Sequence, residues 1–270
     1  MKKFFVLGLG LLFLSFMIVS SPSAGQKIAV GGTGDSQELL RAVAGALEKD
    51  LKGAKIEVPD SVGSGGGIKL LAAGKIDLAR VARPLKEKEK KFGLTYRLFA
   101  RSPVVFVINP SVTGIENITT KEVIGIYAGR ITDWSKLGGK KGKIYPVTRE
   151  PGDSNLSVLE ENLPRFSDIK EVKAKIIYNT PETVQTLADH KNTIGFIPLA
   201  MTKGSGLKIL KLDGIYPSAE NVKNGRYRLV TLFGIVYKGK LNGLARKFVD
   251  FLYSDKGKAI IIKNGAIPAR

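Results

Sequence analysis

The sequence contains no cysteine and only one histidine, His190. Without cysteine the chain can form no disulfide, supply no thiolate nucleophile and carry no lipid of the bacterial lipoprotein kind. It contains no cluster of residues spaced like metal ligands, and no Gly-x-Ser-x-Gly nucleophile elbow. These absences favour a binding protein over an enzyme, with no metal and no cofactor.

Only one long apolar run is present, and it lies at the start of the chain. Lys2 and Lys3 precede the apolar residues 4–19, and small residues follow at 20–25. This order is typical of a secretory signal peptide, and about 16 apolar residues are fewer than the ~20 that a membrane-spanning helix needs. The sequence therefore predicts a signal peptide over residues 1–24 and export to the periplasm. The mature protein is expected not to be embedded in the membrane.

Acidic residues are few relative to basic ones, so the formal net charge is +19. Such a surplus could attract nucleic acid, anionic lipid or small anions. Many of the lysines alternate with glutamates, however, as they do over residues 86–91, which is typical of a solvated surface. We therefore expect no nucleic-acid function. A secreted protein that binds polyanions through its exterior is an alternative, and its binding would weaken steeply with salt.

Short β-branched runs alternate with helical patterns along the mature chain, which indicates an α/β fold. Strands are expected at residues 28–30, 56–58, 76–78, 104–108, 144–147, 175–178 and 194–197. Helices are expected at residues 39–47, 68–71, 120–129, 156–163, 183–188 and 244–252. The extended run 228–237 is long enough to cross back to the first part of the chain. We therefore predict two lobes: residues 25–107 with 230–270 form the first, and residues 108–229 form the second.

Three segments share one design, in which a strand is followed by a loop of small and polar residues and then by a helix start. They are residues 31–36, 63–67 and 149–155. The first four backbone N–H groups of a helix lack partners within it, so a helix start can hold an anion, and glycine lets a ligand approach closely. The candidate ligand-binding residues in these loops are Thr33, Gly34, Asp35, Ser36, Ser64, Gly65, Arg149, Asp153, Ser154 and Asn155.

Among these residues Arg149 is expected to be the charge anchor, because a guanidinium can grip an oxyanion with two donors at once. Thr33, Ser64 and Ser154 would add neutral hydroxyl donors. An alternative remains for the acidic residues, since Asp at a helix start is often an ordinary N-cap. Asp35 with Glu38 even resembles a capping box.

Several further segments carry a resemblance to a known family. They are Val62-Gly63-Ser64-Gly65-Gly66-Gly67-Ile68, residues 74–79, Arg83-Pro84-Leu85, residues 127–134, Arg149-Glu150-Pro151-Gly152, residues 194–196, residues 224–227 and residues 251–259. In this order they resemble the phosphate-binding component of bacterial phosphate ABC transporters, within the type II periplasmic binding protein superfamily.

The resemblance implies two α/β lobes, each a sheet flanked by helices, that are joined by crossing strands and close over a desolvated anion. It further implies phosphate as the ligand, a transporter permease as the partner, and a monomer. No covalent chemistry follows from it. Binding of another anion, such as tungstate, molybdate, a phosphonate or a carboxylate, is an alternative, and a phosphate-ester hydrolase is a further one.

The chain departs from the family pattern at two places. Gly152-Asp153-Ser154-Asn155 stands where the family usually has Gly-Ser-Gly-Thr, and Ala82 stands where it usually has Ser or Asp. Arg80 is an additional basic residue nearby, and Arg83 is expected to brace the lobe interface. A carboxylate can face an oxyanion only when a proton lies between them, because like charges repel. We hypothesise that Asp153 accepts the proton of monohydrogen phosphate, with simple helix capping as the rival role.

Overall fold

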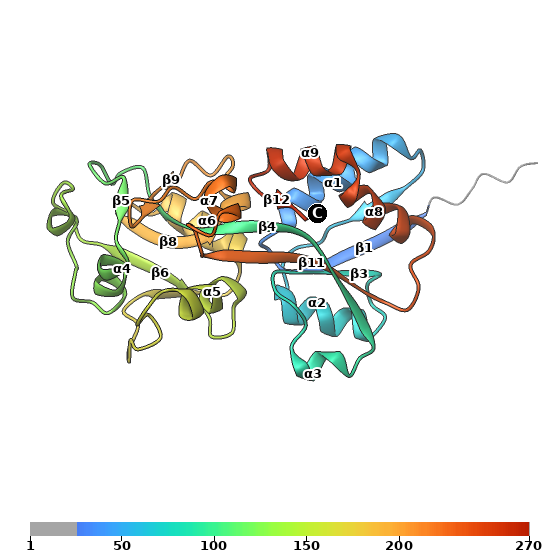
Figure 1. The fold of residues 1–270 in the computed structure, drawn as a ribbon, viewed down its shortest axis with the longest axis horizontal. Coiled ribbons are helices and arrows are strands. Elements are labelled where there is room, and N and C mark those ends of the chain that lie inside the picture. Colours follow the sequence, from blue (N-terminus) through green and yellow to red (C-terminus); the bar gives the residue numbers. More distant parts are fainter. Residues whose placement is uncertain (1–25, 270) are drawn as a thin grey trace, which may run out of the picture.

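The computed structural model describes residues 26–269, so the predicted signal peptide lies outside the described residues. The protein consists of two halves that lie side by side and are connected by two long strands, β4 (Leu94–Ile108) and β11 (Val230–Lys238) (Figure 1). None of the helices in residues 26–269 combines the length and apolarity that crossing a membrane would require.

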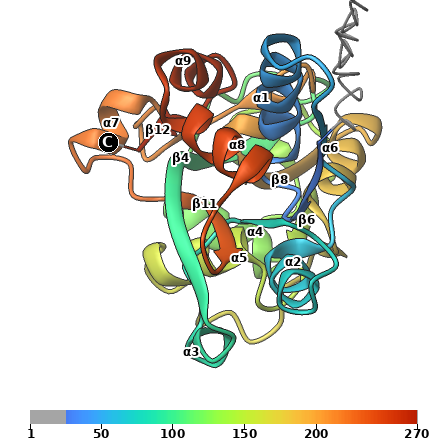
Figure 2. The ribbon, with the colours of Figure 1, turned by 90° about the vertical axis from the view of Figure 1, so that its right-hand side faces the viewer.

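The first half contains both ends of the described chain. Its elements are β1 (Lys27–Gly32), α1 (Gln37–Asp50), β2 (Lys55–Glu57), α2 (Gly63–Ala72), β3 (Leu78–Val81), α3 (Glu87–Lys90), α8 (Gly243–Tyr253), α9 (Asp255–Lys263) and β12 (Ile267–Pro268). β1 pairs in parallel with β2 and β3, and β11 runs antiparallel to β3. Helices α1, α8 and α9 lie on one side of this sheet and α2 lies on the other (Figure 2).

The second half is continuous in sequence. Its elements are β5 (Asn117–Ile118), α4 (Thr120–Tyr127), β6 (Tyr145–Arg149), α5 (Ser154–Asn162), β7 (Lys175–Ile177), α6 (Thr180–Asp189), β8 (Thr193–Pro198), β9 (Lys208–Ile209), β10 (Lys211–Leu212) and α7 (Ala219–Lys223), with short 3₁₀ helices at Trp134–Leu137 and Leu199–Met201. β6 pairs in parallel with β7 and β8, and β8 runs antiparallel to β4. The strand order is therefore β2-β1-β3-β11-β4-β8-β6-β7 across the two halves.

Strand β4 belongs to both halves because it changes partner along its length. Up to Pro103 it pairs with β11, and from Val104 to Ile108 it pairs with β8. The side chains of Val104, Phe106 and Ile108 pack in an apolar core with residues of α4 and α5. We therefore propose that the chain passes between the lobes near Pro103, a few residues before the predicted end of lobe I at residue 107.

Apolar spacing explains the first helix. Leu39, Leu40, Val43 and Leu47 recur at helical intervals, and all four are buried under α8 and α9. This burial fixes α1 against the sheet, so the loop that precedes it is held at the edge where β1 ends.

The structure corrects the predicted helix starts. Helix α4 begins at Thr120 as predicted, but Thr119 caps it, whereas Thr120 was expected to be the cap: the Thr119 hydroxyl accepts from the N–H of Glu122, whose carboxylate accepts from the N–H of Thr119. Helix α2 begins at Gly63, five residues before its predicted start, so the predicted loop 63–67 belongs to the helix. Helix α6 begins at Thr180, three residues before its predicted start, because Asn179 caps it, and this start belongs to the site described next.

Candidate functional site

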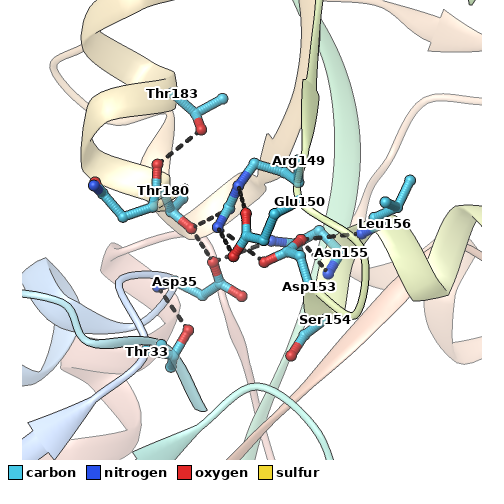
Figure 3. Close-up of polar contacts among 12 residues, drawn as sticks. Thr33, Asp35, Arg149, Glu150, Asp153, Ser154, Asn155, Leu156, Thr180 and Thr183 are labelled. Carbon is cyan, nitrogen blue, oxygen red and sulfur yellow. Dashed lines mark hydrogen bonds and ion pairs between the residues drawn. The ribbon is translucent and has the colours of Figure 1, made fainter. Parts of the chain in front are cut away.

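The starts of four helices meet where the two lobes face each other. Helices α1 and α2 come from lobe I, and α5 and α6 come from lobe II. The hydroxyl of Ser64, at the start of α2, lies 3.4 Å from that of Ser154, at the start of α5. Asp35 accepts hydrogen bonds from Asn155 at 3.0 Å and from the hydroxyl of Thr180 (Figure 3). The three loops singled out in the sequence are thus brought together, and the α6 start joins them.

A cavity of about 500 Å³ opens between the lobes at this place. Of the predicted site residues, Thr33, Gly34, Ser64, Gly65, Arg149, Asp153 and Ser154 line it. Asp35, Ser36 and Asn155 do not line it, since all three are almost fully buried beside it. The predicted residues therefore form two layers, one facing the cavity and one directly behind it.

Arg149 ends strand β6, and its guanidinium is held on several sides. Its Nε donates to the carbonyl of Ile177 at 3.0 Å, and its Nη1 donates to the hydroxyl of Thr180 at 2.8 Å. Its Nη2 pairs with Asp153 at 3.0 Å, and Glu150 lies 3.3 Å from Nε. Nη1 carries two N–H groups and has one acceptor among residues 26–269. The side chain is only 5% exposed, so its charge acts in a weakly screened setting.

Asp153 caps helix α5, as the capping alternative predicted. Its Oδ1 accepts from the backbone N–H groups of Asn155 at 2.9 Å and Leu156 at 3.1 Å. Its Oδ2 pairs with Arg149. Both oxygens of this carboxylate are therefore engaged within its own lobe.

Asp35 does not cap helix α1, so the capping alternative is wrong for this residue. The N-cap position is Ser36, which makes no side-chain capping bond, and Glu38 pairs with Arg41 at 2.8 Å instead of closing a capping box. Burial, followed by the negative charge of Asp153, raises the pKa of the Asp35 carboxyl to about 6, against the opposing effects of Arg149, Thr180 and Asn155. Asp35 is therefore a carboxyl that bridges the two lobes, and its pKa of about 6 leaves it mostly ionised at neutral pH.

Three buried side-chain atoms at this place have no hydrogen-bond partner among residues 26–269. They are Oδ2 of Asp35, Oγ of Ser36 and Oδ1 of Asn155, and the hydroxyl of Tyr96 elsewhere is the fourth such atom. Buried polar atoms are normally bonded. The site thus offers an acceptor and a hydroxyl from lobe I and an acceptor from lobe II in one small region.

Sequence reasoning missed Thr180 and Glu150, which both contact Arg149. The signal for Thr180 was present, because Asn179 followed by Thr180 and Pro181 is a typical helix start. It also interpreted residues 86–91 as a solvated surface, whereas Lys86, Lys88 and Lys91 line the cavity together with Lys69 and Arg83 and form its basic wall in lobe I.

The expectation that Arg83 braces the lobe interface is wrong. Its guanidinium donates to both oxygens of Glu89 at 2.8 Å and to the carbonyl of Pro84, all within lobe I. Ala82 has a structural role through its backbone, because its N–H donates to the hydroxyl of Ser64 at 3.0 Å. The end of β3 thereby orients the hydroxyl that faces lobe II.

A sequence model of the PBP superfamily domain matches residues 19–256. The chain belongs to this superfamily. Among curated members, the phosphate-binding protein PstS of Bacillus subtilis is 28% identical over 252 residues, which cover 91% of this chain and 81% of that protein. The PstS protein of Borreliella burgdorferi is 25% identical over 248 residues, with 88% of each chain covered.

Solved members of the superfamily share the two-lobed architecture. A structure from Clostridium perfringens, described as a phosphate ABC transporter substrate-binding protein with bound phosphate, superimposes with a TM-score of 0.81. It is 26% identical and covers 91% of this chain and 100% of its own. An ABC-type phosphate transport receptor from Vibrio cholerae has a TM-score of 0.65 at 25% identity, with 89% and 99% covered. The predicted fold class, two α/β lobes of the type II kind, is confirmed.

Proposed function

We propose that this protein captures phosphate between its two lobes and delivers it to the permease of an ABC transporter. The observation that carries the proposal is the meeting of Ser64 and Ser154, hydroxyls from opposite lobes, 3.4 Å apart on the cavity that Arg149 also lines. The PstS relatives and the phosphate in the Clostridium perfringens structure support the choice of ligand.

In the proposed mechanism, phosphate binds reversibly, and its binding is coupled to the closure of the two lobes. Thr33 and Ser64 of lobe I and Ser154 of lobe II supply hydroxyl donors, and Arg149 supplies the positive charge. Because the donors come from both lobes, an anion between them stabilises the state in which the lobes are together. A permease that recognises this state would receive loaded protein only.

The proton on the ligand decides which anion fits. Three carboxyls, Asp35, Glu150 and Asp153, surround the single guanidinium of Arg149. A fully ionised tetrahedral anion such as sulfate would be repelled by them, whereas monohydrogen phosphate can donate its proton to one of them. We assign this acceptor role to Asp35 and no longer to Asp153, because Oδ2 of Asp35 has no partner among residues 26–269 and both oxygens of Asp153 are engaged.

A titration against a panel of anions tests the proposal. Purified protein is titrated calorimetrically with phosphate, sulfate, molybdate, tungstate, a phosphonate and a dicarboxylate at pH 7.5. We expect phosphate to bind with the lowest dissociation constant and sulfate to bind at least 100-fold more weakly. The departures from the family pattern at Ala82 and Asp153 leave another anion open as the ligand, namely tungstate, molybdate, a phosphonate or a carboxylate, and the panel contains each of these. Tighter binding of any other anion than of phosphate would overturn the assignment.

The alternative function is that of a phosphate-ester hydrolase, and we propose that the protein has no such activity. Among residues 26–269 no group of three or more His, Asp or Glu side chains is placed to hold a metal ion. Incubation with a phosphate ester and added divalent cations should yield no phosphate above the level without protein. Turnover that saturates with ester concentration would contradict the binding-only role.

The proposal includes export and a monomeric state. We expect the mature chain to begin near residue 25 and to be recovered in the periplasmic fraction. N-terminal sequencing of protein secreted by a bacterial host, together with sedimentation of the purified protein, checks both points. Retention of residues 1–24 in the membrane fraction would contradict the export step.

A further inference from the structure

Arg80 is a buried arginine in the core of lobe I. It lies on β3, its residue is 0% exposed, and it shares a strand face with Leu78 and Ala82, which belong to the apolar core under α1. Arginine is among the residues least often fully buried, and when buried it is usually paired with a carboxylate. Such a position therefore needs a specific explanation.

The guanidinium of Arg80 bonds only to neutral oxygens. Its Nε donates to the carbonyl of Thr33 at 2.7 Å, and its Nη1 donates to the carbonyl of Val30. Its Nη2 donates to the carbonyl of Pro59 at 2.7 Å and to the side-chain oxygen of Gln37 at 3.1 Å. One side chain thus joins the end of β1, the loop after it, the first turn of α1 and the segment that leads to α2.

The backbone of Arg80 strengthens the same arrangement. Its carbonyl accepts from the N–H of Thr33 at 3.0 Å. Gly32 passes so close that a Cβ there would lie 2.0 Å from that carbonyl oxygen, and a Cβ on Gly67 would lie 2.7 Å from the Cα of Gly32. The end of β1 and the first turns of α2 therefore pack directly against each other, and Gly32 packs against the backbone of Arg80. A larger residue at Gly32 or Gly67 would not fit.

An apolar side chain could fill this space without the cost of removing a charge from water. Burial lowers the pKa of Arg80 to about 10, which still leaves it charged at neutral pH. An apolar residue, however, could not make the four hydrogen bonds that Arg80 makes. These bonds hold β1, the loop before α1, the first turn of α1 and the segment before α2 together.

We propose that Arg80 is the positioning residue of the anion site, which fixes the loops carrying Thr33, Asp35 and Ser64 so that they meet lobe II together. The inference rests on the proposed function, since the site that it positions is the phosphate site. It assigns to Arg80 a role in ligand affinity beyond its contribution to the stability of lobe I.

The first test compares phosphate affinity in Arg80→Gln and Arg80→Lys with that of the parent protein. Lysine keeps the charge but cannot bond four separated oxygens, so we expect both variants to bind at least 10-fold more weakly. Arg41→Gln is the matched control, because Arg41 donates to the carbonyl of Val58 and pairs with Glu38 and Asp60 on the surface of the same lobe. It should change affinity less than 2-fold.

A second control separates positioning from stability. Val43→Ala removes buried apolar volume from α1 and lowers the melting temperature without touching the loops. Its affinity, measured well below its melting temperature, should stay within 2-fold of the parent protein. If Val43→Ala loses as much affinity as Arg80→Gln at equal loss of stability, the role of Arg80 is only structural and the proposal fails.

The pH profile gives a readout that stability alone does not move. In the parent protein, phosphate affinity should change with a midpoint near the Asp35 pKa of about 6. In Arg80→Gln the loop is released, Asp35 becomes solvated, and the midpoint should fall toward the ordinary value of an aspartate. An unchanged midpoint in a folded Arg80→Gln variant would overturn the proposal.

Amide hydrogen exchange tests the same inference without any ligand. We expect residues 32–36 and 62–66 to exchange at least 10-fold faster in Arg80→Gln than in the parent protein, and to be unaffected in Arg41→Gln. Unchanged protection of both loops would overturn the role of Arg80, whereas failure of the parent protein to bind phosphate would overturn the proposed function alone. Should Arg80→Gln not fold, Gln37→Ala removes one of the four acceptors and should raise exchange in residues 32–36 by a smaller factor.

Discussion

Asp35 and Asn155 are joined across the two lobes by a hydrogen bond of 3.0 Å, although 120 positions separate them in the chain. Asp35 stands in the loop before α1 of lobe I, and Asn155 stands in the first turn of α5 of lobe II. Nδ2 of Asn155 is the donor, so the bond forms with Asp35 in either protonation state. The contact between the lobes is consequently made by the same loops that carry the candidate site.

Replacing Asp35 by asparagine should change how stability depends on pH. The folded pKa of about 6 lies above the ordinary 3.8, so the stabilisation by the bound proton is fully present below pH 3.8 and is lost as the pH rises through 6. Between pH 4 and pH 7 the parent protein should lose on the order of 3 kcal/mol of unfolding free energy relative to Asp35→Asn. Urea denaturation at several pH values measures the difference. Parallel curves for the two proteins would show that Asp35 is not a buried titrating group.

The same substitution should alter the choice of anion. An asparagine amide can donate to a fully ionised oxyanion, whereas the Asp35 carboxylate can only accept. We expect Asp35→Asn to bind phosphate at least 10-fold more weakly and to bind sulfate more tightly than the parent protein. Calorimetric titration with both anions gives the ratio of the sulfate dissociation constant to the phosphate dissociation constant. If this ratio is the same in Asp35→Asn and in the parent protein, another carboxyl accepts the phosphate proton.

Replacing Asp153 by alanine separates capping from ligand contact. Loss of the cap should cost about 1 kcal/mol of stability, and Arg149 would lose a carboxylate partner at 3.0 Å. Because that carboxylate competes with an anion for Arg149, phosphate affinity should stay the same or increase. Thr119→Ala, which removes the cap of α4, should show the same loss of stability with no change in affinity. A 10-fold drop in affinity in Asp153→Ala alone would instead support the original hypothesis that Asp153 accepts the phosphate proton.

Replacing Gly34 by alanine should keep the lobes apart. A Cβ at this position would lie 2.5 Å from Cδ of Pro181, at the start of α6 in the opposite lobe. We expect Gly34→Ala to bind phosphate at least 10-fold more weakly while each lobe stays folded. Gly45→Ala, inside α1 where the new methyl group would meet no atom within 4 Å apart from its own helix backbone, should raise stability by about 1 kcal/mol without changing affinity. Wild-type affinity in Gly34→Ala would mean that phosphate binds without this contact between the lobes.

The sequence was sufficient to predict the helix starts of the site because their chemistry is local. Glycine, Ser and Thr between a strand and a helix indicate an exposed helix start, and the loops at 31–36, 63–67 and 149–155 were predicted in this way. Thr180 was missed because its helix was expected to begin at Thr183, where the apolar pattern starts, and the capping Asn179 was not weighed. The boundary of a helix is set by its cap, which periodicity does not detect.

The roles of the two aspartates could not be separated from the sequence. Asp35 and Asp153 each precede a helix by one or two residues, and both patterns fit an N-cap. Only the tertiary arrangement shows that Asp153 bonds to its own helix while Asp35 reaches Asn155 and Thr180 in the other lobe. For the same reason the burial of Arg80 was not anticipated, since four acceptors from distant segments surround it.

Lobe I is assembled from both ends of the chain, and this sets an order of folding. Helices α8 and α9 cover α1, and Lys256 of α9 pairs with Asp50 at the end of α1 at 2.6 Å. Until residues 243–263 have been synthesised, the apolar face of α1 can pack only on the strands of its own sheet, whereas lobe II already has its complete sequence. The second lobe can therefore complete its core before the first lobe can, because lobe I lacks α8 and α9 until the end of synthesis.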